Sequence, residues 1–112
     1  MTPIQKRLQI SHKTISKWVY SEQDIKGRNL DLRFYRDKYK REVDFVVIEN
    51  QKPILFIEAK YSQTEIAQGL SYLKAKFPQV RALQVHMPGR NEYVNNLGIK
   101  SIHVKTLLAE LN

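Results

Sequence analysis

The sequence predicts an α/β fold (α+β) in which a mixed sheet is flanked by helices, and three observations lead to this prediction. Three apolar stretches separated by short polar turns follow one another between residues 30 and 61, which is typical of an antiparallel meander. A helical pattern at 62–77 lies between the third stretch and a fourth at 80–87, which favours a crossover to a parallel strand. The length of 112 residues suits a single domain, residues 1–112, with one core.

The N-terminal half begins with a helix and continues with the three strands of the meander. Apolar residues recur at helical spacing in residues 3–22, and Gly27 is a stop signal. The segment 30–37 (LDLRFYRD) has the aliphatic and aromatic residues of a strand, and a polar turn follows. Further strands are expected at 42–49 (EVDFVVIE) and 54–61 (ILFIEAKY), joined by the turn NQKP.

The C-terminal half is expected to mix helices and strands. Residues 62–77 carry apolar side chains at the spacing of a buried helical stripe, and a proline follows the last of them. We expect strands at 80–87 and 99–104, a loop at 88–98 with at most one helical turn, and a closing helix at 105–112.

Composition limits the possible classes of function. There is no cysteine, which excludes disulfides and thiolate metal sites. The start lacks a signal-peptide core and the longest apolar run is four residues, so we expect a cytoplasmic protein without a membrane span. Residues 1–41 carry 11 Lys/Arg and 4 Asp/Glu, whereas residues 42–112 carry 8 and 7. This basic excess favours a polyanionic partner such as DNA, and the alternative is a solvated basic face.

Three charged residues lie in otherwise apolar strands: Asp44 beside FVVI, and Glu58 and Lys60 after ILFI. A charge in a strand that packs on a core is costly unless it is paired or binds a metal. If the two strands pair as a hairpin, Asp44 comes level with Glu58 and Lys60 at the end away from the turn. Two carboxylates suit Mg²⁺, and a neighbouring lysine can orient or deprotonate a water. The alternative is an ion-pair cluster at a sheet end.

The spacing of these residues resembles a known nuclease pattern. Asp44, followed fourteen residues later by Glu58-Ala59-Lys60, resembles the D…ExK core of the PD-(D/E)XK nuclease superfamily. The string FYRDKYKREVDFVVIENQKPILFIEAKYS is similar to the C-terminal nuclease-like domain (DUF4143) of a family of prokaryotic AAA-type ATPases. The resemblance implies a restriction-endonuclease-like αβββαβ core. It also implies that Asp44, Glu58 and the carbonyl of Ala59 bind Mg²⁺ or Mn²⁺, and that Lys60 assists the attacking water.

The resemblance extends to the helix that follows. QGLSY is similar to the Q-x-x-x-Y motif of the RecB-like and Holliday-junction-resolvase branches, and Gln68 would contact substrate or order the site. Nuclease domains of this size often use a second copy, so a homodimer is implied. With the basic and aromatic segment RFYRDKYKR, the nucleic-acid-binding residues expected are Lys13, Lys17, Arg36, Lys38, Lys40, Arg41 and Tyr72.

Two departures from the family pattern keep other functions open. Ser16 stands where the first helix of the family carries an acidic residue, and no G-x-x-x-x-G-K-[ST] motif marks this chain as the ATPase. One alternative is a catalytically degenerate nuclease-fold module that binds DNA or a protein partner. Another is a helix-turn-helix protein, with residues 2–20 forming two helices around a turn at 9–11 and presenting His12 to Lys17 to DNA.

Overall fold

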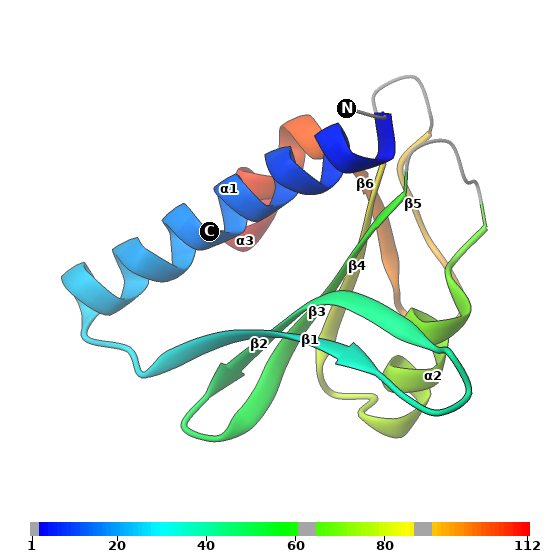
Figure 1. The fold of residues 1–112 in the computed structure, drawn as a ribbon, viewed down its shortest axis with the longest axis horizontal. Coiled ribbons are helices and arrows are strands. Elements are labelled where there is room, and N and C mark those ends of the chain that lie inside the picture. Colours follow the sequence, from blue (N-terminus) through cyan, green and yellow to red (C-terminus); the bar gives the residue numbers. More distant parts are fainter. Residues whose placement is uncertain (1–2, 61–64, 87–90) are drawn as a thin grey trace.

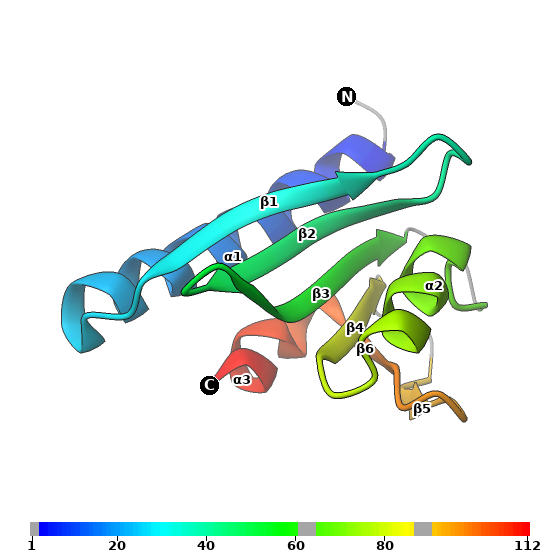
Figure 2. The ribbon, with the colours of Figure 1, turned by 90° about the horizontal axis from the view of Figure 1, so that it is seen from below.

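The structure of the protein is a computed structural model that describes residues 3–60, 65–86 and 91–112. Helices α1 (Pro3–Lys26) and α3 (Leu107–Leu111) cover one face of a six-stranded sheet, and α2 (Gln68–Lys76) covers the other (Figure 1). Figure 2 shows the same layers from below. The first six elements follow the predicted order of helix, three strands, helix and strand. The predicted α+β class, with a mixed sheet flanked by helices, is confirmed.

The sheet contains both the predicted meander and the predicted crossover. Strands β1, β2 and β3 pair antiparallel, whereas β4 runs parallel to β3, and β6 runs parallel to β4. The carboxyl ends of β3, β4 and β6 therefore lie at one edge of the sheet, together with the amino end of β2. In spatial order the strands are β1 (Leu30–Arg36), β2 (Glu42–Glu49), β3 (Lys52–Lys60), β4 (Arg81–His86), β6 (Lys100–His103) and β5 (Tyr93–Val94).

Alternation along the strands divides the buried side chains between two cores. Ile15, Trp18 and Val19 of α1 pack with Leu107 and Leu111 of α3 on one face of the sheet. The second core lies between the other face and α2, and it contains Val43, Val46, Phe56, Leu70, Leu73 and Ile99. Because side chains alternate along β3, Glu58 and Lys60 lie on the same face of the sheet as Phe56, the face that α2 covers.

Helix α1 is continuous from Pro3 to Lys26, so the predicted turn at 9–11 and the helix-turn-helix interpretation are wrong. In the part of α1 whose side chains are described, Ile15, Trp18 and Val19 pack on the sheet as the apolar face of an amphipathic helix, the alternative expected for this segment. None of the described helices is long and apolar enough to cross a membrane.

Two other segments differ from expectation. Helix α2 begins at Gln68 rather than at 62, and residues 61–64 lie outside the described residues. A hydrogen bond from the Ala67 N–H to Gln84 Oε1 holds the preceding segment in an extended conformation. Among the described residues of the predicted loop at 88–98, Tyr93 and Val94 form strand β5 by pairing with β6.

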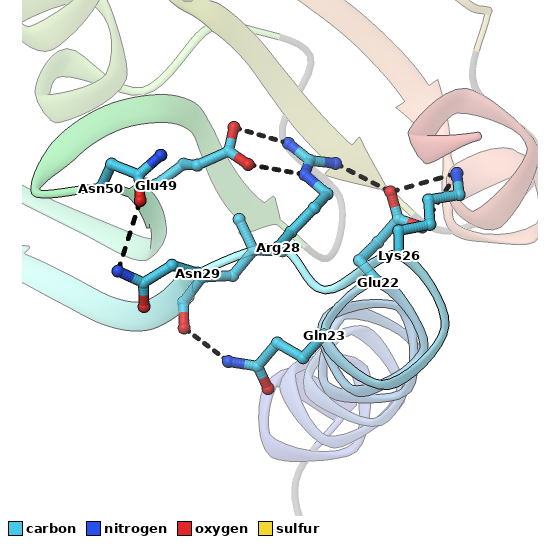
Figure 3. Close-up of polar contacts among 8 residues, drawn as sticks. Glu22, Gln23, Lys26, Arg28, Asn29, Glu49 and Asn50 are labelled. Carbon is cyan, nitrogen blue, oxygen red and sulfur yellow. Dashed lines mark hydrogen bonds and ion pairs between the residues drawn. The ribbon is translucent and has the colours of Figure 1, made fainter.

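A cluster of oppositely charged side chains joins the C-terminal part of α1 to the carboxyl end of β2 (Figure 3). Arg28 donates to Glu49 through Nε (2.8 Å) and Nη2 (2.9 Å), and to Glu22 Oε1 through Nη1 (2.8 Å). Lys26 also lies 3.1 Å from Glu22. These contacts lower the pKa of both carboxyl groups, as expected where each carboxylate faces a cation.

Candidate functional site

The three charged residues singled out in the sequence meet at one end of the sheet. The backbone N–H of Asp44 donates to Glu58 Oε1 (2.9 Å), and the N–H of Ala59 donates to Asp44 Oδ2 (2.9 Å). Lys60 Nζ lies 3.2 Å from Glu58 Oε2. The expected convergence of two carboxylates and one ammonium is therefore observed, whereas their catalytic and metal-binding roles stay predictions.

A bulge in β2 lies beside the carboxylates. Between two aligned pairs, β1 advances two residues, from Arg33 to Tyr35, while β2 advances three, from Val46 to Val43. The extra residue falls next to Asp44, where backbone N–H groups bond to the two carboxylates. Bulges locally interrupt strand pairing and re-aim side chains, and they are common near active sites. Here the two bonds tie each carboxylate to the backbone of the neighbouring strand.

The electrostatics of this pair are unfavourable for the charged form of Glu58. Burial, followed by the charge of Asp44, raises the pKa of Glu58 to about 7, although the Asp44 N–H and Lys60 act in the opposite direction. The Glu58 residue is 5% exposed. A carboxyl group with a raised pKa next to a like charge is typical of a functional site. A cation placed between the two groups would relieve their repulsion.

The donor set fits a hard divalent cation. Both carboxylates offer oxygen, the element that Mg²⁺ prefers, and among the described residues Oδ1 of Asp44 accepts no hydrogen bond. Within the same part of the chain, no group of three or more His, Asp or Glu side chains gathers as a metal site. An ion held by Asp44, Glu58 and the predicted carbonyl of Ala59 would take its remaining ligands from water, as Mg²⁺ commonly does. The hydroxyl of Ser16 contacts His12 Nδ1 (3.4 Å) on α1.

Strand β4 adds polar residues that the sequence analysis did not single out. Gln84 pairs with Glu58, and His86 pairs with Lys60, so each shares the face of its parallel neighbour. Buried Gln84 accepts from Ala67 N–H (2.8 Å) and donates to the Glu65 carbonyl (2.8 Å), which fixes the approach to α2. The signal was present in VRALQVHM, whose polar residues alternate with apolar ones as Glu58 and Lys60 do. Ligand sites in such sheets lie beyond the carboxyl ends of parallel strands, where these side chains are.

Helix α2 is set against the start of β2 by a close backbone approach. A Cβ at Gly69 would collide with the backbone carbonyl of Glu42, so this position accepts no larger residue without a shift. Gln68 is exposed at the start of α2, and no described contact joins it to the carboxylates. Tyr72 is half-buried, with the Arg41 guanidinium 3.5 Å from its ring centroid. The two residues of the predicted Q-x-x-x-Y motif thus have different surroundings.

The predicted nucleic-acid-binding residues fall into two groups. Lys13 and Lys17 are exposed on α1, the helix that covers the face opposite α2. The others belong to the end of the β1–β2 hairpin or to α2, on the side that carries the carboxylates. This second group consists of Arg36, Lys38, Lys40, Arg41 and Tyr72.

Comparison with known proteins gives a family without an assigned function. No curated protein matches the chain. The family model described as "Domain of unknown function (DUF4143)" matches residues 14–107, which contain every strand of the sheet and the residues Asp44, Glu58 and Lys60. This match confirms the association with DUF4143, and the chain therefore belongs to the DUF4143 family.

Proposed function

We propose that Asp44, Glu58 and Lys60 form a metal-dependent site that hydrolyses phosphodiester bonds in DNA. The observation that carries the proposal is the pair of like charges held together by the main chain at the sheet edge. A purely structural ion-pair cluster is present elsewhere in this chain, around Arg28, and there the carboxyl pKa values are lowered. At the Asp44–Glu58 pair, burial and the charge of Asp44 raise the pKa of Glu58 instead, and such a perturbed carboxyl group supports a functional site.

Each residue has a role that its position allows. Asp44 and Glu58, with the carbonyl of Ala59, would hold Mg²⁺ or Mn²⁺ by their oxygen atoms. The ion, when bound, supplies a Lewis acid for the phosphodiester and lowers the pKa of a water. Lys60, 3.2 Å from Glu58, would orient that water or stabilise the charge that develops on the phosphate. The basic residues of the hairpin would hold the polynucleotide backbone electrostatically.

A second candidate is a nuclease-fold module that binds DNA or a protein partner without cleavage. Two observations favour it: Ser16 occupies the position of the expected acid, and its described contact is with His12 rather than with the carboxylates. In the part of the chain that the structure describes, no third acidic side chain completes a metal site. This module would bind DNA in a salt-dependent manner and leave it intact.

The test is cleavage of single-stranded, duplex and branched DNA in Mg²⁺ and in Mn²⁺ by the wild type and Lys60→Ala. Lys52→Ala is the matched control, because Lys52 is an exposed lysine at the other end of the same strand. We expect hydrolysis by the wild type and Lys52→Ala, and a loss of about 10²- to 10⁴-fold in Lys60→Ala. Equal hydrolysis by all three would contradict the assignment of Lys60, and hydrolysis by none would favour the binding module.

The homodimer implied by the family resemblance is a separate proposal. Light scattering on the full chain, with and without DNA, measures its mass directly. A mass of two chains supports the dimer, and a mass of one chain in both conditions rejects it.

A further inference from the structure

The turn between β1 and β2 is organised around one carboxylate. Oδ1 of Asp37 accepts the N–H groups of Tyr39 (2.9 Å) and Arg41 (3.1 Å). Oδ2 accepts the Tyr35 hydroxyl (2.8 Å) and the Arg41 Nε (2.7 Å). Lys40 adopts a left-handed conformation with φ of 63° between them. Four bonds to one side chain fix a turn that would otherwise be mobile, so its exposed residues are presented in a defined arrangement.

A column of stacked side chains supports the tip of this turn. The Arg41 guanidinium lies 4.9 Å from the ring centroid of Tyr39 and 3.5 Å from that of Tyr72. Tyr72 in turn stacks on Tyr35, with centroids 6.4 Å apart and an interplanar angle of 30°. Tyr39 ends the column and is 66% exposed. Its ring is therefore backed by a cation that is anchored to α2, while most of its surface faces solvent.

The surroundings of Tyr39 are basic. Arg36, Lys38 and Lys40 are exposed on the same hairpin end, and Lys38 Nζ lies 5.2 Å from the Tyr39 ring. The two acidic residues between positions 36 and 42 are each matched by an arginine: Asp37 by Arg41 at 2.7 Å, and Glu42 by Arg36 at 3.2 Å. The segment retains an excess of positive charge, which suits a polyanion.

This tip lies near the proposed site. Tyr39 lies five positions before Asp44 in the chain, so their Cα atoms are at most about 18 Å apart. The close approach of Gly69 to Glu42 and the stacking of Arg41 on Tyr72 tie the turn to α2. Helix α2 covers the face that carries Asp44 and Glu58. A polynucleotide strand of a few nucleotides could therefore contact both places.

We infer that Tyr39 is a stacking platform for an unpaired base and that Lys38 and Lys40 hold the neighbouring phosphates. The substrate class of the site is then a single-stranded nucleic acid. An aromatic ring next to lysines and arginines is the combination that binds single strands without sequence preference. Bases inside a duplex already stack on one another, so a duplex would gain only the phosphate contacts. This inference rests on the proposed function for its link to Asp44 and Glu58.

The experiment measures affinity by fluorescence anisotropy in EDTA, where cleavage is blocked. The probes are a labelled DNA strand, its duplex and the RNA strand of the same sequence. The variants are Tyr39→Ala, Tyr39→Trp and Tyr20→Ala. Tyr20 is the matched control, since it is 69% exposed but lies on α1.

We expect the wild type to prefer the single strand over the duplex. Tyr39→Ala should weaken single-strand binding about 5- to 150-fold, the range for one base stacked on an aromatic ring. Tyr39→Trp should retain it, and Tyr20→Ala should leave it unchanged. Lys38→Ala should weaken binding to single strand and duplex alike and reduce the salt slope by about 0.7 to 0.9. Preference for either the DNA or the RNA strand supports the inference and identifies the sugar.

Equal wild-type affinity for single strand and duplex would overturn the inference, as would equal effects of Tyr39→Ala and Tyr20→Ala. These outcomes are separate from those of the proposed function. Loss of single-strand binding in Tyr39→Ala, with no hydrolysis by the wild type in Mn²⁺, would reject the proposed hydrolysis and support the stacking role of Tyr39. Hydrolysis of single-stranded DNA by the wild type, with single-strand affinity unaffected by Tyr39→Ala, would support the proposed hydrolysis and reject the stacking role of Tyr39.

Discussion

Replacing Glu58 by glutamine should stabilise the protein at high pH, because it removes a buried charge that faces Asp44. The pKa of Glu58 rises from 4.5 to about 7 on folding, and each tenfold change in proton affinity corresponds to about 1.4 kcal/mol. A raised pKa means that the folded state binds the proton more tightly than the unfolded state. The stabilising contribution is therefore complete below about pH 4.5 and is lost as the pH rises through about 7.

The magnitude follows from the same shift. Glutamine carries no charge at any pH and approximates the protonated glutamate. Glu58→Gln should raise the free energy of unfolding relative to the wild type by about 1 kcal/mol near pH 5 and by about 3 kcal/mol near pH 8. Urea denaturation of both proteins across this range, in the presence of EDTA, measures the difference.

The matched control is Glu49→Gln, which should behave in the opposite way. Arg28 lowers the pKa of Glu49, so its carboxylate stabilises the fold above the unfolded pKa, and this contribution is lost as the pH falls. Glu49→Gln should therefore destabilise the protein at neutral pH. A Glu58→Gln variant that is less stable than the wild type near pH 8, or a stability difference independent of pH, would show that folding does not raise the pKa of Glu58.

Three further predictions concern the elements that position the site. Gly69→Ala should lower the free energy of unfolding by about 1 to 3 kcal/mol in urea denaturation, because the new Cβ would collide with Glu42; a neutral effect would show that α2 can move away freely. Arg28→Ala should lower the thermal midpoint clearly more than Arg33→Ala, since Arg33 forms an exposed pair of little worth; equal shifts would contradict this. Asp37→Asn should weaken single-strand binding, because it removes hydrogen bonds that hold the turn. In the wild type these bonds lower the pKa of Asp37 to about 2, so they should persist down to about that pH. A titration midpoint near 4 for this carboxyl group, measured by NMR, would contradict the prediction.

The meeting of Asp44, Glu58 and Lys60 was predictable because it depends on local rules. Strand alternation and a short turn fix the register of a hairpin, and the register brings the three residues to one end. The paired register of β2 and β3 confirms that expectation. The layers were predictable for the same reason, since the apolar stripes of α1 and α2 must each be buried against a face of the sheet.

The rest depends on contacts between residues far apart in the chain. The start of α2 could not be read from its apolar stripe, because Gln84, a residue of the following strand, holds Ala67 in an extended conformation. The bulge beside Asp44 could not be predicted from the sequence, because β2 contains no glycine that would mark its position. Arg41 was expected to contact nucleic acid, but its guanidinium is committed to Asp37 and to the ring of Tyr72. Pattern alone assigns such a residue to the surface, and only tertiary packing shows that it supports the turn.

Whether Asp44 and Glu58 bind a divalent cation can be measured by isothermal titration calorimetry with Mn²⁺. The proteins are the wild type, Asp44→Asn and Asp31→Asn, the last being an exposed acid already paired with Arg33. If Asp44 and Glu58 hold a divalent cation, the wild type and Asp31→Asn will bind one ion per chain, and Asp44→Asn will bind it at least about tenfold more weakly. Absence of binding by the wild type, or equal binding by all three proteins, would contradict the claim that the two carboxylates form a metal site.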